Sequence, residues 1–232
     1  KKVINGKKIL AVVPARGGSK GIKLKNLRKI NKISLVSHVG NTIKKIKIID
    51  KAILSTDNKK IAKVAIESGL TVPFIRPKGI SGDKVSDYKV IIHALKFAEK
   101  KDKVKYDIVV SLPPTSPLRK SKDVIGAIKL LINKKYDAVW TVSKTDSKYH
   151  PLKQLSITKN KLKYYNPKGA KIIARQQLDK VYHRNGVAYV ISRNCLVNLK
   201  SILSRNSGAY VVKGNQISID TLSDIKFANS LF

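Results

Sequence analysis

The 232-residue sequence has little cysteine, few acidic residues and no long apolar run. Its single cysteine, Cys195, excludes an internal disulfide and has no neighbours spaced as metal ligands, which is typical of a reducing compartment. Nothing around Cys195 would lower the pKa of its thiol, so a catalytic thiolate is not expected. No apolar run approaches the ~20 residues that a membrane-spanning helix needs, and the start does not resemble a secretory signal. We therefore expect a soluble, cytoplasmic protein with no membrane partner.

Acidic residues number 14 against 49 lysines and arginines, which gives a formal net charge of +35. Clustered basic residues would favour nucleic-acid binding, because they neutralise phosphates. Here the lysines are spread along the whole chain, and aromatic residues are not interleaved with them as a platform for stacked bases requires. Solvated lysines on helix faces are the simpler interpretation, and a charge-driven nucleic-acid-binding protein is the less favoured alternative.

The most informative stretch follows an apolar run over residues 9–13, which predicts a buried parallel strand. Glycines then allow backbone N–H groups to face an anion, and the cations Arg16, Lys20 and Lys25 lie within the same short stretch. Such a loop at the carboxyl end of a first strand is where an open α/β sheet holds a phosphate-bearing ligand. Taken alone, the pattern would more often be a glycine-rich turn with solvated lysines.

Apolar periodicity predicts alternating strands and helices as far as residue 142. We expect strands at 52–55, 72–75, 108–112 and 138–142, and helices with apolar faces over 35–46, 61–65, 90–98 and 124–132, the last capped by Ser121. Further along the chain, strands are expected at 187–191, 210–212 and 217–219, and helices at 196–203 and 222–231. This alternation predicts an α/β fold with a mostly parallel sheet and right-handed crossovers.

The alternation fails between residues 144 and 180, where short strands and loops are expected. We therefore predict a core formed by residues 1–143 and 181–232, with 144–180 as an insertion. The insertion is too short to be an independent domain, so we expect something else to stabilise it, such as a second subunit.

Eight short motifs occur in order along nearly the whole chain, and together they resemble the N-acylneuraminate cytidylyltransferases. The motifs are Pro14-Ala15-Arg16-Gly17-Gly18-Ser19-Lys20-Gly21 with Lys25-Asn26, Leu54-Ser55-Thr56-Asp57-Asn58, Arg76-Pro77 with Asp83, Pro114-Thr115-Ser116-Pro117-Leu118-Arg119, His150-Pro151-Leu152-Lys153, Arg175-Gln176-Gln177-Leu178, Asn185-Gly186 with Tyr189, and Ile219-Asp220-Thr221 with Asp224.

This resemblance implies transfer of CMP from CTP to the anomeric hydroxyl of a nonulosonic acid of the sialic, legionaminic or pseudaminic type, with release of pyrophosphate. It also implies a Rossmann-like three-layer nucleotidyltransferase fold, a divalent cation (Mg²⁺) and a homodimer. In this family the inserted segment mediates dimerisation and reaches toward the neighbouring active site.

For the nucleotide, the resemblance implies that Arg16 and Lys20 hold the triphosphate and that Lys25 lies near the α-phosphate. Attack on that phosphate spreads negative charge over its oxygens and over the leaving pyrophosphate, so catalysis depends on positioning and electrostatic stabilisation. The implied catalytic residues are Arg16, Lys25 and Asp220, with Asp220 also the metal ligand. The implied CTP-binding residues are Ala15, Arg16, Gly17, Ser19, Lys20, Asn26, Arg76, Ser86 and Asp87, helped by the turn that begins at Asp83.

For the sugar, the resemblance implies a second set of residues nearer the end of the chain. Lys153 resembles a lysine that fixes the carboxylate of a 2-keto acid, because such a substrate needs a positioned cation. The implied sugar-binding residues are Lys153, Arg175, His183, Arg184, Asn185 and Tyr189.

Three positions depart from the family pattern. Pro113 replaces a glutamine that is thought to contact the acyl sugar, His183 replaces a sugar-binding arginine, and Ser218 replaces the first of two metal-binding aspartates. Proline donates no hydrogen bond, and a serine hydroxyl is a poorer Mg²⁺ ligand than a carboxylate. These departures leave open the alternative that the chain is a catalytically impaired homologue that binds CTP or CMP. Asp224 is expected to act at the start of a helix instead of as a ligand.

Overall fold

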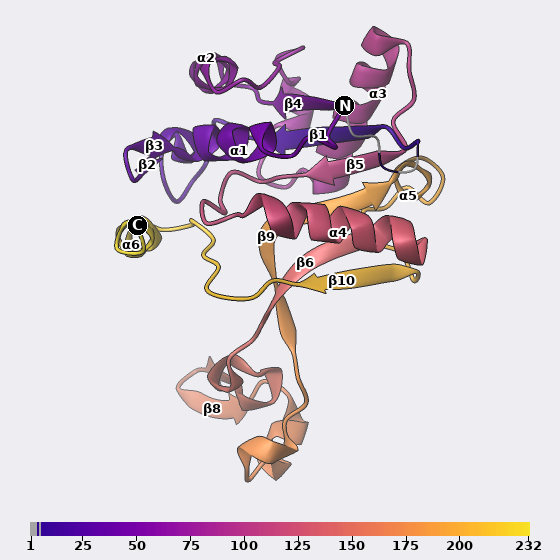
Figure 1. Ribbon diagram of the computed structural model, residues 1–232. Coiled ribbons are helices and arrows are strands. Elements are labelled where there is room, and N and C mark those ends of the chain that lie inside the picture. Colours follow the sequence, from indigo (N-terminus) through magenta and orange to yellow (C-terminus); the bar gives the residue numbers. More distant parts are fainter. Residues whose placement is uncertain (1–3, 5) are drawn as a thin grey trace.

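The structure, a computed structural model, describes residue 4 and residues 6–232 (Figure 1). The expected core begins at residue 1, so its residues 1–3 and 5 lie outside the described residues. A six-stranded sheet with the order β10-β6-β9-β5-β1-β4 forms the centre. Its strands are β1 (Ile9–Pro14), β4 (Lys51–Ser55), β5 (Ile108–Ser111), β6 (Ala138–Lys144), β9 (Tyr182–Ser192) and β10 (Ser207–Val211). Within this sheet, β9 is antiparallel to its neighbours and every other strand pair is parallel, which confirms the predicted mostly parallel α/β sheet.

Helices cover both faces of the sheet, giving three layers (Figure 1). Successive side chains of a strand point to opposite faces, so Ile9, Ala11 and Val13 pack in one cluster while Leu10 and Val12 pack in the other. Burial on both sides explains why this strand reads as a continuous apolar run. The first cluster includes α1 (Leu35–Lys44), α2 (Lys59–Glu67) and α4 (Ser121–Lys134), and the second includes α3 (Asp87–Asp102) and α5 (Arg193–Val197).

A smaller unit lies beside the sheet and contains the end of the chain. The hairpin β2 (Lys29–Ile30) and β3 (Ile33–Ser34) contacts α6 (Leu222–Asn229), and a third apolar cluster joins them. Two single-turn helices, η1 (Lys25–Leu27) and η2 (Lys78–Ile80), belong to the loops at the carboxyl ends of the strands. In the chain that the structure describes, no helix is both long enough and apolar enough to cross a membrane.

Two of the expected strands are absent from the sheet. Residues 72–75 follow a single bridge between Thr71 and Ile53, and Pro73, which has no N–H to donate, interrupts the run. Residues 217–219 are extended without a strand partner, although Ile219 is buried and its N–H donates to the carbonyl of Thr115 (2.9 Å). At 217–219 the apolar pattern reports the burial of Ile219 and not pairing, whereas residues 72–75 are only partly buried and Ile75 is 47% exposed.

Several helix limits also differ from the expected ones, and α1 ends at Lys44 instead of 46. Helix α5 ends at Val197 instead of 203, because Lys200 adopts a left-handed conformation (φ 51°) and turns the chain. Helix α4 begins at Ser121, with Lys120 in the capping position. Helix α6 ends at Asn229 instead of 231.

Strand β9 is antiparallel to both of its neighbours, and its pairing with β6 is interrupted. Trp140 lies opposite Tyr189 and Val142 lies opposite Arg184, so Thr141 alone faces residues 185–188. This bulge lies where the pairing of β9 with β5 ends, at Ser111 and Tyr189, whereas β6 continues past it to Lys144. Periodicity does not report strand direction, so the sequence did not predict this arrangement.

Between β6 and β9 the chain leaves the core as a protruding arm, residues 145–181 (Figure 1). Its hairpin turns through Lys159 and Asn160, which both have positive φ (47° and 61°), as a two-residue hairpin turn requires. The arm contains η3 (Ser147–Tyr149), η4 (Pro151–Lys153), β7 (Leu155–Thr158), β8 (Lys161–Tyr164), η5 (Pro167–Lys171) and η6 (Arg175–Gln177).

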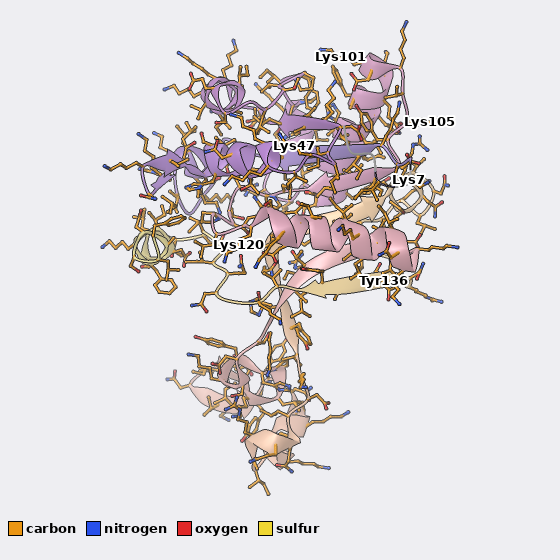
Figure 2. The ribbon with its side chains drawn as sticks, viewed as in Figure 1. Lys7, Lys47, Lys101, Lys105, Lys120 and Tyr136 are labelled. Atoms are coloured by element: carbon orange, nitrogen blue, oxygen red, sulfur yellow. The ribbon has the colours of Figure 1, made fainter. Side chains whose placement is uncertain are left out.

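The lysines are distributed over the whole of the core. Figure 2 labels exposed lysines from separate elements and loops, including Lys7, Lys47, Lys101 and Lys120. This distribution favours solvated charge over one basic binding face.

Candidate active site

The carboxyl ends of the strands open into a pocket of about 770 Å³, here called the main pocket. Loops from both halves of the chain form it. Predicted residues that line it are Arg16, Ser19, Lys20, Lys25, Asn26, Arg76, Asp87, Arg184, Asn185, Tyr189 and Asp220, together with the departures Pro113 and Ser218.

The glycine-rich loop after β1 is held in shape by its neighbours. The N–H of Gly17 donates to the carboxylate of Asp57 (2.7 Å), and the side-chain amide of buried Asn26 donates to the carbonyl of Arg16 (2.9 Å). An added Cβ at Gly21 would lie 2.9 Å from the carbonyl oxygen of Asp220, so only glycine permits the close approach of these two loops. The loop and Asp220 therefore face the same space.

The cations of this loop are paired with carboxylates that also line the main pocket. Arg16 and Lys20 both contact Asp83, at 2.7 and 2.8 Å, and Lys25 contacts Asp220 at 2.8 Å. The hydrogen bond from Lys20, with the positive charge of Arg16, lowers the pKa of Asp83 below its usual value. Lys25 is largely buried whereas Asp220 is exposed.

Arg76 forms a buried, positively charged part of the same wall. Its Nε donates to the hydroxyl of Ser81 (3.2 Å), and its N–H donates to the carbonyl of Thr56 (2.7 Å). Burial lowers the pKa of Arg76, and the neighbouring charge of Asp57 opposes this change. Asp87 lies in the first turn of α3, after Ser86 in the capping position, where the helix dipole favours a negative charge.

The opposite wall is formed by the loop after β5 and the β9 bulge, and the buried Arg119 joins them. Its guanidinium donates to the carbonyls of Pro113, Gly186 (2.9 Å) and Val187. Burial lowers the pKa of Arg119 to about 9, so the group stays protonated at neutral pH. Three carbonyl oxygens thus satisfy a charge that would otherwise be costly to bury.

Aromatic and amide side chains complete this wall. The rings of Trp140 and Tyr189 meet edge to face (5.1 Å between centroids), and the guanidinium of Arg184 lies 5.6 Å from the Trp140 ring centroid. The amide of Asn185 donates to Ser143 (3.1 Å) and accepts from the N–H of Val187 (3.1 Å). That amide therefore supports the bulge in this chain.

Several predicted residues lie outside the main pocket. Ala15, Gly17 and Ser86 adjoin residues that line it, and His183 lies in the neck of the arm, with its ring 3.0 Å from the hydroxyl of Thr145. Lys153 lies in the arm, and Arg175 lines a separate pocket of about 420 Å³ there. Within one chain, the structure does not bring Lys153 and Arg175 to the main pocket.

Asp220 and its neighbours are the residues that could hold a metal ion. One carboxylate oxygen of Asp220 accepts from Lys25 and the other accepts from Ser218 (3.1 Å). Asp224 instead accepts from the N–H groups of Asp220 and Thr221 at the start of α6, as predicted. Over residue 4 and residues 6–232, no group of three or more His, Cys, Asp or Glu side chains is arranged to hold a metal.

Sequence reasoning missed the structural roles of Asp57, Asp83 and Arg119. All three lie within the quoted motifs, but their partners are far away in sequence, and local spacing carries no signal for such contacts. Burial raises the pKa of Cys195 to about 11, which agrees with the expectation that it is not a thiolate nucleophile.

A mostly parallel three-layer sheet, with a glycine-rich loop and several cations around one pocket at its carboxyl edge, defines an α/β nucleotide-binding protein. The family model described as Cytidylyltransferase matches residues 10–231. The chain therefore belongs to the cytidylyltransferase family and is a nucleotidyltransferase, which confirms the resemblance inferred from the motifs.

Relatives and solved structures agree with this assignment. A CMP-N,N'-diacetyllegionaminic acid synthase of Campylobacter jejuni is 30% identical and aligns with 96% of this chain and 94% of its own length. A pseudaminic acid cytidylyltransferase of the same species is 28% identical, with 97% and 96% covered. A solved CMP-2-keto-3-deoxy-manno-octonic acid synthetase in complex with CTP has the same fold, with a TM-score of 0.73 and 15% identity over 97% of this chain and 98% of that one.

Proposed function

We propose that this chain transfers CMP from CTP to the anomeric hydroxyl of a nonulosonic acid of the sialic, legionaminic or pseudaminic type and releases pyrophosphate. The observation that carries the proposal is the meeting of Arg16, Lys20, Lys25 and Arg76 in one pocket at the carboxyl edge of the sheet. The full-length relatives named for legionaminic and pseudaminic acids support this class of acceptor.

Arg16 and Lys20 would hold the triphosphate, and Lys25 would stabilise the charge that develops on the α-phosphate. Lys25 suits this role because its side chain is largely buried and its ammonium points into the main pocket beside Asp220. The remaining nucleotide contacts are assigned to Ala15, Gly17, Ser19, Asn26, Arg76, Ser86 and Asp87.

Mg²⁺ is proposed as the cofactor, with Asp220 as its protein ligand. Mg²⁺ keeps several waters and commonly takes only one or two carboxylates besides the substrate phosphates, so a single exposed aspartate fits this ion. When bound, Mg²⁺ would neutralise phosphate charge. Ser218 lies within hydrogen-bond distance of Asp220 and would orient its carboxylate.

A homodimer is proposed to complete the sugar site. A two-stranded hairpin has little stability alone, and the arm exposes a group of large apolar side chains: Leu155, Ile157, Leu162, Tyr164, Tyr165 and Ile173. Packing against a second copy would cover them. The arm's Lys153 and Arg175, remote from the main pocket of their own chain, would then bind the sugar in the other copy, beside His183, Arg184, Asn185 and Tyr189.

A cytoplasmic location is also proposed. The single cysteine of the chain, Cys195, is buried and free, and the proposed substrate is a nucleotide.

A pyrophosphate-release assay with CTP, Mg²⁺ and a panel of sialic, legionaminic and pseudaminic acids tests the proposal. We expect turnover with one acid of the panel. No turnover with any of them would contradict the transferase activity and favour the second candidate, an impaired homologue that binds CTP or CMP.

Pro113 and Ser218 are the observations behind that second candidate, and Ser218→Asp separates the two. A silent parent whose Ser218→Asp variant turns over would identify an enzyme impaired at its metal site. Calorimetric binding of CTP to the silent parent would support the same conclusion.

Replacing Arg16 tests the proposed stabilisation of phosphate charge. Arg16→Ala should lower kcat/KM by about 10²- to 10³-fold, the usual cost of removing one well-placed transition-state donor. The exposed Arg28, which does not line the main pocket, provides the control, because Arg28→Ala removes the same charge. Equal losses in both variants would contradict the assigned role.

A further inference from the structure

Asp83 occupies an unusual position between two cations that the proposed function assigns to the substrate. Its two carboxylate oxygens contact Arg16 at 2.7 Å and Lys20 at 2.8 Å. Asp83 belongs to the turn between η2 and α3, whereas both cations belong to the glycine-rich loop after β1. One acidic side chain therefore joins two loops that both line the main pocket.

The turn that carries Asp83 does not need these ion pairs to keep its shape. Backbone hydrogen bonds close it from Ile80 to Pro77, from Ser81 to Lys78 and from Val85 to Gly82. Buried Arg76 also anchors it through the hydroxyl of Ser81. The carboxylate of Asp83 contacts Arg16 and Lys20 of the glycine-rich loop, so these contacts bear on the pocket and not on the fold of the turn.

The ion pairs are also easy to open. The side chains of Asp83 and Arg16 are about one-third exposed (33% and 35%), and that of Lys20 is 84% exposed. Exposed pairs of this kind contribute little to stability, so a bound anion can replace the carboxylate at small cost.

Resting on the proposed binding of CTP, we infer that Asp83 is a placeholder for the triphosphate, a carboxylate that holds Arg16 and Lys20 in position and is displaced when the phosphates bind. Before the substrate binds, Arg16 and Lys20 are thus paired with a carboxylate that belongs to the chain itself and cannot diffuse away. The same carboxylate weakens triphosphate binding, since it competes for both cations and repels a ligand of like charge. Asp83 thereby favours release of the charged product, and it also holds both cations in position for the incoming substrate.

Isothermal titration calorimetry on the full chain tests this inference with three ligands: CTP, inorganic tripolyphosphate and cytidine. The titrations are made at one low ionic strength without added Mg²⁺, so that no metal neutralises the phosphates. In Asp83→Asn the Kd for CTP and for tripolyphosphate should fall by about 3- to 10-fold, the effect of removing two exposed ion pairs and one repulsive charge. The Kd for cytidine should stay unchanged, because cytidine carries no phosphate.

Two further variants make the result specific. Asp83→Glu keeps the charge and should bind tripolyphosphate as the parent does. Glu67→Gln removes the same charge from an exposed site on α2, outside the main pocket, and should leave all three affinities unchanged. Unchanged or weaker phosphate binding by Asp83→Asn, or equal tightening by Glu67→Gln, overturns the placeholder.

Failure of the proposed function gives a different result. A parent that binds tripolyphosphate but does not bind CTP, either without Mg²⁺ or with Mg²⁺ added, would contradict cytidylyl transfer, while tighter tripolyphosphate binding by Asp83→Asn would still support the placeholder. A parent that binds CTP with no gain in Asp83→Asn would contradict the placeholder alone.

Discussion

Arg119 is a buried guanidinium that joins two segments of one wall of the main pocket. It donates to the carbonyl of Pro113 in the loop after β5 and to those of Gly186 and Val187 in the β9 bulge. Both Pro113 and Gly186 line the pocket, so the distance between the two segments depends on a side chain that does not line it. We regard Arg119 as a positioning residue for the proposed acceptor side.

Arg119→Lys keeps the charge but loses the planar fork that reaches three oxygens. We expect the free energy of unfolding to fall by about 2–3 kcal/mol, the cost of unsatisfied buried polar groups, and kcat/KM to fall by as much as about 100-fold. Urea denaturation and the pyrophosphate-release assay measure the two effects.

The control for this variant is Arg193→Lys. Arg193 holds Glu99 through two contacts (2.8 and 3.1 Å) away from the pocket, so its loss should affect stability and leave kcat/KM unchanged. If Arg119→Lys behaved in the same way, its role in the pocket would be disproved.

At the residue scale, the sequence brought several distant polar residues to one edge of the sheet, and the structure places them in one pocket. Arg16, Lys25, Asn26 and Asp220 could be assigned to one pocket because the carboxyl ends of parallel strands meet at one edge. The sequence could not predict the partner of Asp83, because ion pairs between distant segments leave no periodic trace.

At the element scale, the β9 bulge shapes one wall of the main pocket, and Gly186 is its critical residue. Gly186 has φ 68°, and an added Cβ would lie 2.7 Å from the hydroxyl of Ser116. That hydroxyl already donates to the carbonyl of Asn185 (2.9 Å), so a methyl group would both strain the backbone and disrupt the contact between the bulge and the neighbouring loop.

Gly186→Ala should therefore lower the free energy of unfolding by about 1–3 kcal/mol and reduce turnover. Thermal denaturation should show a Tm lower by roughly 3–10 °C for a chain of this size. Gly214→Ala is the matched control, because Gly214 has a similar φ of 83° with nothing within 4 Å of its Cβ. An equal loss of activity in both variants would argue against a special role of the bulge.

Strands and helices with strong apolar periodicity were predicted close to their observed limits. The failures have physical causes. Pro73 removes a donor from the expected strand at 72–75, and the extended segment 217–219 packs its apolar side chains without joining the sheet. The direction of β9 escaped prediction because a buried strand has the same apolar run in either orientation.

At the scale of the whole molecule, the arm links the proposed dimer to activity. Ile157 is 72% exposed on the hairpin of one chain. Ile157→Lys should weaken a dimer that buries this side chain, and activity should fall with it, because Lys153 and Arg175 would no longer reach a second pocket. Light scattering after size-exclusion chromatography measures the mass, and pyrophosphate release at matched concentrations measures the activity.

Ile66→Lys gives a control of the same kind, since Ile66 is 59% exposed on α2 and remote from the arm. A parent of monomeric mass would contradict the proposed dimer directly. A monomeric Ile157→Lys variant with full activity would show that the sugar site needs no second copy.

The bulge also divides β9 into two segments with different resistance to opening. Residues 189–191 pair with β5 on one side and with β6 on the other, whereas residues 182–184 pair with β6 alone at the neck of the arm. Amide hydrogen exchange should therefore be slow in the first segment and fast in the second. The wall of the main pocket proposed to bind the sugar thus lies at the boundary between a part of the chain that is expected to open only on global unfolding and a part that can fray locally.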